Sequence, residues 1–165
     1  MKPVRDMTRL ELAGFVAAEF RRRNISVVLS GGSCVSIYSR GKYVSMDLDF
    51  VNVAFTKRDR IRAAMESLGF REENRYFRHP DTDILIEFPP GPLGIGEEPV
   101  KQIVEMETGA GTLRIISPTD YRPPGIAGVF RPFVPDTLDR VAPAPLGGLP
   151  GQSVVRDEGI PGPTN

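Results

Sequence analysis

Two short stretches organise the chain, VVLSGGS at residues 27–33 and DLDF at residues 47–50. The first is β-branched and apolar before two glycines, which predicts a strand that runs into a tight turn. The second has the pattern of a strand with two carboxylates one residue apart. Because strand side chains alternate between faces, Asp47 and Asp49 project to one side. Their apolar neighbours project to the other: Met46, Leu48 and Phe50. The alternation therefore predicts that one face of this strand packs in the core and that the other carries a functional site.

Length and charge narrow the class of protein. The chain has 165 residues, enough for one domain with a real core, and its 21 basic and 21 acidic residues give a formal net charge of zero. Nothing in that balance indicates a nucleic-acid or membrane-surface protein. The single cysteine, Cys34, fits a reducing compartment. Without a signal-peptide pattern or an apolar run of about 18 residues, we expect a cytoplasmic protein with no membrane partner.

Helix and strand patterns alternate along the first half of the chain. The predicted elements are a helix over 7–23, a strand over 25–29, a helix over 34–39, a strand over 44–53 and a helix over 56–68. Thr8 or Asp6 is the expected cap of the first helix, Ser33 of the second and Thr56 of the third, with Gly69 as the stop of the third.

The second half predicts strands and then a tail. Residues 70–78 read as an irregular strand leading to a turn at 79–82, and residues 83–88 as a strong strand. Strands over 100–107 and 112–116, separated by Gly-Ala-Gly, predict a hairpin. From residue 121 to 165, 16 of 45 residues are Pro or Gly, a density that suppresses regular structure. The expected organisation is a domain at 1–120 with a disordered tail at 121–165, and the fold class is α+β, a mixed β-sheet flanked by helices.

Some residues admit a functional and a structural interpretation. The run Arg21-Arg22-Arg23 reads as a polyphosphate or RNA patch or, more simply, as the solvated end of a helix. His79 is a candidate ligand or an exposed turn residue, and Cys34 a candidate nucleophile or a small packing residue. We favour the structural interpretation of each.

The residues with the clearest chemistry are carboxylates and glycines. Gly31, Gly32 and Ser33 place backbone N–H groups before a helix, which is a natural seat for phosphate, and Lys42 lies between this turn and the carboxylates. Asp47, Asp49 and Glu87 stand on predicted strands, Glu87 at a strand end. Three such carboxylates suit the hard cation Mg²⁺, and two ions close together serve phosphoryl or nucleotidyl transfer.

These motifs resemble the nucleotidyltransferase superfamily that includes DNA polymerase β, the CCA-adding enzymes and the aminoglycoside nucleotidyltransferases. Gly32-Ser33 and Asp47-Leu48-Asp49 match its pattern, and residues 26–117 also look like small prokaryotic nucleotidyltransferase-like proteins related to abortive-infection toxins, in which the segment at 87–93 recurs. The resemblance makes Glu87 the third acid. It implies two Mg²⁺ ions, an NTP substrate, and transfer of a nucleoside monophosphate to a hydroxyl of an RNA such as tRNA, a protein or a small molecule.

Two departures from the family pattern support alternatives to an active enzyme. The third acid is Glu87 where catalytic members usually carry Asp, and a Pro/Gly-rich tail stands where relatives continue with a helix containing Lys and Arg. A diverged or frameshifted C-terminus accounts for the tail. The alternatives are a catalytically degenerate binding or regulatory protein, as in a toxin–antitoxin pair, and a structural remnant that folds poorly.

Overall fold

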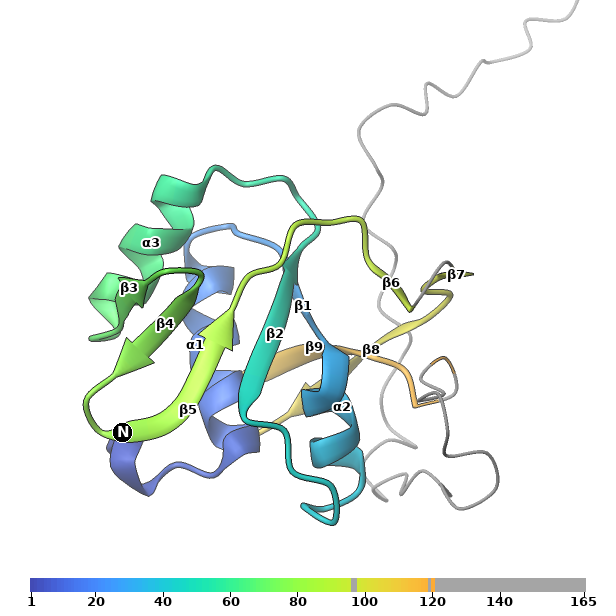
Figure 1. Ribbon diagram of the computed structural model, residues 1–165, viewed down its shortest axis with the longest axis horizontal. Helices are drawn as coiled ribbons and strands as arrows, with labels where there is room; N and C mark the ends of the chain where they lie inside the picture. Colours follow the sequence, from blue (N-terminus) through green and yellow to red (C-terminus); the bar gives the residue numbers. More distant parts are fainter. Residues whose placement is uncertain (96–97, 119, 121–165) are drawn as a thin grey trace, which may run out of the picture.

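A seven-stranded mixed sheet forms the centre of the protein, in the strand order β3-β4-β5-β2-β1-β9-β8 (Figure 1). The computed structural model describes residues 1–95, 98–118 and 120. The strands of this sheet are β1 (Val27–Ser30), β2 (Asp47–Asn52), β3 (Arg71–Glu73), β4 (Tyr76–His79), β5 (Thr82–Glu87), β8 (Ile103–Glu107) and β9 (Thr112–Ile116). A separate two-stranded pair joins β6 (Gly94–Ile95) to β7 (Glu98–Pro99). The fold is α+β, as the sequence predicts.

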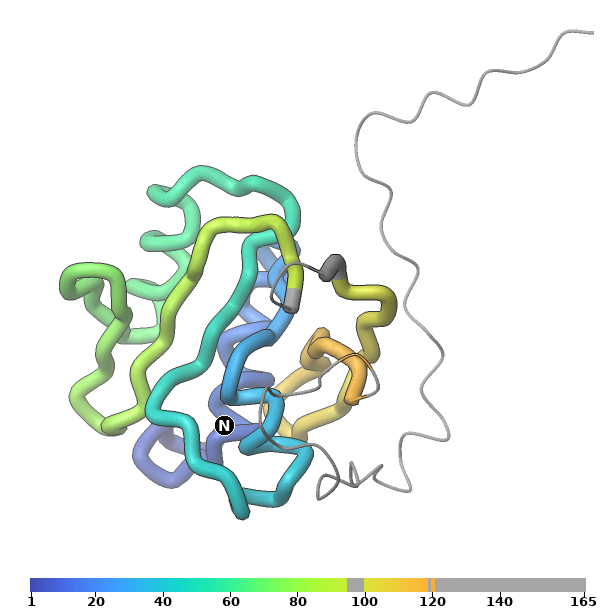
Figure 2. Tube along the Cα trace, turned by 45° about the vertical axis from the view of Figure 1, so that its right-hand side comes forward, coloured from blue at the N-terminus to red at the C-terminus, as the bar shows by residue number. Residues whose placement is uncertain are grey.

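The sheet is mixed because its central strands run in both directions. β1 pairs antiparallel with β2 and parallel with β9, while β2 pairs parallel with β5. The two hairpins, β3–β4 and β8–β9, lie at opposite ends of the sheet, as the green and orange segments of Figure 2 show. The parallel β2–β5 pair has the register Asp47↔Leu85 and Asp49↔Glu87. This register brings residues of two predicted strands to the same level of the sheet.

Three α-helices occur in the described residues, preceded by a short 3₁₀ turn, η1 (Val4–Asp6). They are α1 (Arg9–Arg22), α2 (Gly31–Tyr38) and α3 (Arg58–Ser67). Thr8 caps α1 in a capping box, in which its side chain accepts from the Glu11 N–H and the Glu11 carboxylate accepts from the Thr8 N–H. The prediction of Thr8 as a cap is confirmed. Every helix in the described residues falls short of the length and apolar character needed to cross a bilayer.

Most of the core lies between α1, α3 and one face of the sheet, and Cys34 and Tyr38 of α2 also belong to it; α1 passes behind β5 and β2 in Figure 1. Phe88 is its centre, stacked on Phe20 of α1 at 5.0 Å and on Phe50 of β2 at 5.8 Å, with Phe77 of β4 meeting it edge-on at 5.6 Å. Burying each aromatic side chain stabilises the fold by roughly 1.5–3 kcal/mol. The prediction that Leu48 and Phe50 face the core is confirmed, since both are fully buried.

Met46 is a correction. We expected it on the core face with Leu48 and Phe50, yet it is 69% exposed. The cause is that β2 begins at Asp47 and not at residue 44, so the residues before it lie in an exposed loop where strand alternation does not apply.

Two predicted helix caps were also wrong. α2 begins at Gly31 with Ser30 as its N-cap, and Ser33 lies inside the first turn, where its hydroxyl donates to the Ser30 carbonyl at 2.8 Å. α3 has Lys57 as its N-cap in place of Thr56, because Thr56 is held by Asn52, whose side chain accepts from its N–H and donates to its carbonyl. The stop at Gly69 is confirmed by a left-handed φ of +87°.

The segment predicted as one irregular strand over 70–78 is a hairpin. β3 and β4 pair antiparallel, with Glu73 opposite Tyr76 and a tight turn between them. Asn74 in this turn has φ +57°, the left-handed conformation that Asn tolerates better than most residues. His79 ends β4, so the following turn is shorter than the predicted 79–82. The predicted tail at 121–165 lies outside the described residues.

Candidate functional site

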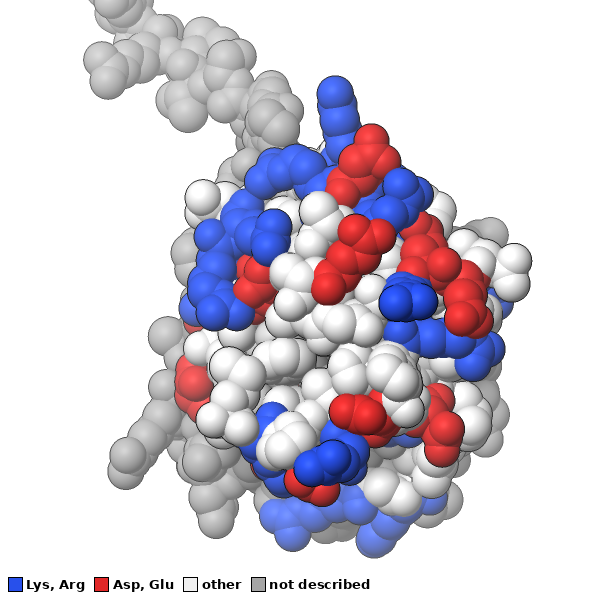
Figure 3. All heavy atoms as spheres, turned by 90° about the vertical axis from the view of Figure 1, so that its left-hand side faces the viewer, with Lys and Arg blue, Asp and Glu red and all other residues white. Residues whose placement is uncertain are grey.

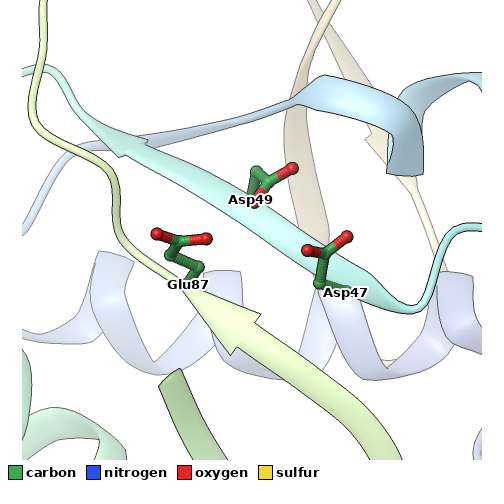
Figure 4. A group of neighbouring side chains, drawn as sticks. All are labelled: Asp47, Asp49 and Glu87. Carbon is green, nitrogen blue, oxygen red and sulfur yellow. The ribbon is translucent and has the colours of Figure 1, made fainter. Parts of the chain in front are cut away.

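The acids of the predicted site come from two neighbouring strands. Asp47 and Asp49 lie on β2, and Glu87 ends β5, opposite Asp49 in the parallel register. Their carboxylate oxygens can be chosen so that all lie within 4.8 Å of one another. Figure 4 shows the three side chains on the same side of β2 and β5, with α1 behind these strands. Strand alternation thus separates the acids from the core by the thickness of the sheet.

The spacing and the donor set suit a hard divalent cation. Mg²⁺ prefers oxygen ligands at about 2.1 Å, so two oxygens on opposite sides of one ion lie about 4.2 Å apart. The observed limit of 4.8 Å is close to that separation, and all the donors are carboxylates. The residues present therefore fit a Mg²⁺ or Mn²⁺ centre.

Electrostatics at Asp49 support the same conclusion. Burial, the largest cause, and the nearby charges of Asp47 and Glu87 together raise the pKa of Asp49 to about 6, against a smaller lowering by Arg75. In the described part of the chain, no Lys or Arg forms an ion pair with Asp47 or Asp49. The three acids share one ion pair, between Arg75 and Glu87, so they still repel one another, and a bound cation relieves that repulsion.

Polar neighbours hold the Asp47 end of the cluster. The Ser45 hydroxyl donates to Asp47 Oδ1 at 2.8 Å, which orients that carboxylate. Arg9, at the start of α1, lies 3.4 Å from the Asp47 carbonyl oxygen, and burial lowers the pKa of its guanidinium. Neither contact follows from sequence spacing, because Arg9 is 38 residues from Asp47 and Ser45 lies in a loop that we expected to be strand.

The glycines bring the start of α2 against the carboxylates. A Cβ atom on Gly31 would lie 2.2 Å from Asp49 Oδ2, and Gly31 has φ +66°. Both facts require glycine at this position. Ser30 makes no side-chain cap, so the first N–H groups of α2 have no side-chain acceptor at the cap position. The predicted glycine turn is therefore the first turn of the helix itself, beside Asp49.

The other residues predicted for the site are Ser33, Gly32 and Lys42, and each has its own surroundings. Ser33 is fully buried, and its hydroxyl donates to the Ser30 carbonyl. Gly32 faces the loop before β2, where a Cβ would come 3.2 Å from Ser45 Oγ. Lys42 is exposed in the polar turn after α2, with its N–H donated to the Ser39 carbonyl at 3.2 Å.

The alternatives at Arg21–Arg23 and Cys34 fit their structural interpretation. Arg22 and Arg23 form ion pairs with Glu19, and Arg21 pairs with Glu105 at 2.7 Å. Cys34 is fully buried, and burial raises the pKa of its thiol far above the usual range, which disfavours the nucleophilic thiolate.

His79 has contacts of its own. Its ring packs on Phe70 at 4.9 Å, and its Nδ1 accepts from the Asp81 N–H at 3.1 Å. The interpretation of His79 as an exposed turn residue was wrong, because it ends strand β4 and is half-buried against Phe70. It is not part of the acidic cluster.

Arginines on α3 are bridged to acids of the β3–β4 hairpin. Glu72 accepts from Arg58 and from Arg62, each at 2.6 Å, and Arg58 also lies over the Phe77 ring at 5.1 Å. Figure 3 faces this side of the molecule and shows Lys and Arg side chains interspersed with Asp and Glu side chains. The ion pairs of Glu72 with Arg58 and Arg62 hold α3 against the β3–β4 hairpin.

Comparisons with known proteins add one structural likeness. Neither protein-family models nor curated proteins match the chain. Among solved structures, the crystal structure of ANT(2")-Ia in complex with adenylyl-2"-tobramycin is similar at 22% sequence identity and a TM-score of 0.45. The similarity covers 67% of this chain and 70% of that one.

Proposed function

We propose that this protein transfers a nucleoside monophosphate from an NTP to a hydroxyl acceptor in a reaction that depends on divalent metal, as a member of the nucleotidyltransferase superfamily. The observation that carries the proposal is the cluster of Asp47, Asp49 and Glu87, whose oxygens lie within 4.8 Å of one another beside the first turn of α2. A carboxylate cluster next to free helix N–H groups combines a metal site with a phosphate site.

The acids have the role of metal ligands. Asp47 and Asp49 would hold two Mg²⁺ ions, and Glu87 would complete the ligand set from β5. When bound, such ions supply Lewis-acid polarisation of the reacting phosphate and charge neutralisation for the pyrophosphate that leaves. Glu87 also helps to take the proton from the acceptor hydroxyl. Its longer side chain reaches the cluster from the register position opposite Asp49, so Glu in place of Asp still meets the two aspartates.

The glycine end of α2 has the role of the phosphate seat. The N–H groups of Gly31, Gly32 and Ser33 bind the β- and γ-phosphates, favoured by the positive end of the helix dipole. Lys42 adds a positive charge from the adjacent exposed turn. The acceptor is an RNA, a protein or a small molecule with a free hydroxyl, and the cytoplasm supplies both NTP and Mg²⁺.

Binding of Mg²⁺ and NTP tests the metal and nucleotide part of this proposal. Isothermal titration with Mg²⁺ and each NTP is expected to show binding in the wild type that is lost in Asp47→Asn and Asp49→Asn. Asp83→Asn is the matched control, because Asp83 is an exposed acid on the same strand as Glu87 but outside the cluster. Binding that survives both cluster substitutions would refute the assignment.

Turnover separates the enzyme from a second candidate. The ion pair between Arg75 and Glu87, 3.4 Å between Nε and Oε1, occupies the proposed third ligand and favours a degenerate protein that binds nucleotide without turnover, in a regulatory role or a toxin–antitoxin pair. Single-turnover assays with radiolabelled NTP across tRNA, protein and small hydroxyl acceptors are expected to label one class. Metal-dependent NTP binding with no labelled acceptor would favour the regulatory candidate.

A further inference from the structure

Arg75 is a positive charge that the fold brings to the acidic cluster from a distant part of the chain. It lies in the turn between β3 and β4, outside every motif in the sequence, and its side chain is 69% exposed. Its Nε lies 3.4 Å from Glu87 Oε1, and its charge also lowers the pKa of Asp49. Arg75 therefore faces the site and not the surrounding solvent alone.

The orientation of Arg75 is fixed by its neighbour. Its Nη2 donates to the Tyr76 hydroxyl at 2.6 Å, and its Cζ lies 4.9 Å from the Tyr76 ring centroid. Tyr76 is paired with Glu87 in the antiparallel β4–β5 ladder, so the two side chains share the carboxylate face of the sheet. Of the five N–H donors of the guanidinium, the described contacts use two.

The contact between Arg75 and Glu87 is weak enough to exchange. It is a single contact at the long end of the ion-pair range, made by an arginine that is mostly in solvent. Exposed pairs of this kind contribute little to stability, so releasing Arg75 from Glu87 has a small cost. An incoming cation competes with Arg75 for the Glu87 carboxylate, whereas an incoming phosphate offers Arg75 a new partner of higher charge.

The sheet order places Arg75 and α2 on opposite sides of the acids. α2 follows β1 and touches Asp49 through Gly31, while Arg75 precedes β4 and touches Glu87 on β5. If the β- and γ-phosphates of a triphosphate were seated on α2, its α-phosphate would extend over the acids, toward the Arg75 side. Charge that develops on the α-phosphoryl oxygens during transfer would lie within reach of the free guanidinium donors.

We propose that Arg75 is a nucleotide-binding residue that leaves Glu87 when metal and nucleotide bind and then donates to the α-phosphate. This inference rests on the proposed nucleotidyl transfer and adds a residue to it. It makes two predictions of opposite sign for the same variant. Removing the guanidinium weakens nucleotide binding because a phosphate contact is lost, and it strengthens metal binding because a competitor for Glu87 is gone.

Calorimetric titration of purified full-length variants tests both signs with two probes, Mn²⁺ alone and α,β-methylene-ATP with Mg²⁺. For Arg75→Met we expect binding of the ATP analogue about tenfold weaker than in the wild type, and binding of Mn²⁺ a few-fold tighter. Arg75→Lys keeps the charge but not the fork of donors, so for both probes we expect its affinity to lie between those of the wild type and Arg75→Met. Adenosine, which lacks phosphate, is expected to bind wild type and Arg75→Met equally.

Arg78→Met is the matched control. Arg78 is also an exposed arginine of this hairpin, but it pairs with Glu73 at 3.0 Å. We expect it to leave both titrations unchanged, and thermal melts of all variants establish that each is folded. Equal affinity of wild type and Arg75→Met for the ATP analogue would overturn the role of Arg75 while leaving the proposed function intact. Analogue binding that is unaffected by Asp47→Asn would instead overturn the proposed function, and no analogue binding by the wild type would overturn both.

Discussion

The two faces of strands β2 and β5 are built from alternate residues of the same segments, yet they differ in every physical respect. On one face, Phe50 and Ile86 are fully buried against α1 and the aromatic cluster around Phe88. On the other, Asp49 and Glu87 are half-buried and carry like charges, and Asp49 lies against the first turn of α2. Burial of apolar side chains stabilises one face, whereas on the other face the neighbouring carboxylates repel one another.

The difference shows how a small sheet combines a stable core with a cluster of acids on its other face. A strand has a side-chain period of two, so a residue can be placed for function without removing its neighbours from the core. The hydrophobic face holds the backbone of β2 and β5 in one register, and that register fixes the separation of Asp49 and Glu87. The predictions that follow alter each face in turn.

The largest expected effect comes from breaking the core face. Phe50→Ala removes a fully buried ring that stacks on Phe88, and it should reduce the free energy of unfolding by about 3–5 kcal/mol. Urea denaturation measures the loss. Phe55→Ala is the matched control, because Phe55 is 71% exposed and its removal should change stability by no more than about 0.5 kcal/mol. Equal losses in both variants would show that the aromatic cluster is not the core.

These two faces were not equally predictable from the sequence. Local alternation correctly assigned Leu48 and Phe50 to the core and the acids to the opposite face, because that pattern depends only on neighbouring residues. It failed for Met46, which lies before the strand begins. The strand end at Glu87 was also predictable, since prolines follow it.

Other parts of the site depend on contacts between distant residues, which no local pattern contains. Arg75 reaches Glu87 only because β3 and β4 form a hairpin, and the one signal for that hairpin is Asn74, a residue typical of left-handed turns. The sequence correctly predicted that the glycines allow a close approach of the backbone, but it placed the start of α2 three residues too late. Its true reason, the approach of Gly31 to Asp49, is a tertiary contact.

The second largest effect is expected on the carboxylate face. Asp49→Asn should weaken metal binding and nucleotidyl transfer by roughly 10²–10³-fold, because it removes a half-buried charge from the centre of the cluster's electrostatic contacts, with Asp47 and Glu87 both acting on it. The same variant should melt no lower than the wild type, since it also removes repulsion from Asp47 and Glu87. Metal titration and thermal melts of one preparation measure both. A large drop in melting temperature would mean that this face is structural.

A third change tests the contact between helix and acid. Gly31→Ala introduces a Cβ at a left-handed φ and 2.2 Å from Asp49 Oδ2, so we expect a loss of about 2–3 kcal/mol in stability together with weaker Mn²⁺ binding. Gly41→Ala isolates the backbone part, because Gly41 has φ +77° but no atom within 4 Å of its Cβ position. That control should lose about 1–2 kcal/mol and bind Mn²⁺ normally. If Gly41→Ala impaired metal binding equally, the approach of Gly31 would not be the cause.

The smallest expected effect is a pH dependence. The folded-state pKa of Asp49, about 6, lies above its unfolded value, so the folded state binds more protons between pH 4 and pH 6. The free energy of unfolding from this group therefore falls as the pH rises through that window, by about 1–2 kcal/mol after allowance for solvent screening. Chemical denaturation of wild type and Asp49→Asn across pH 4–7.5, without metal, measures the difference. Parallel curves for the two proteins would contradict the raised pKa.

The contact between Tyr38 and β9 links α2 to a strand that lies much later in the sequence. Tyr38 is buried at the end of α2, and its hydroxyl donates to the Ile116 carbonyl at 2.8 Å, across 78 residues of chain. β9 also lies beside β1, the strand that leads into Gly31. The helix that meets Asp49 is thus tethered at its other end to the last strand of the sheet. A chain cut before residue 112 would keep every proposed ligand and lose the anchor of the proposed phosphate seat, so the proposed site depends on more of the chain than its motifs.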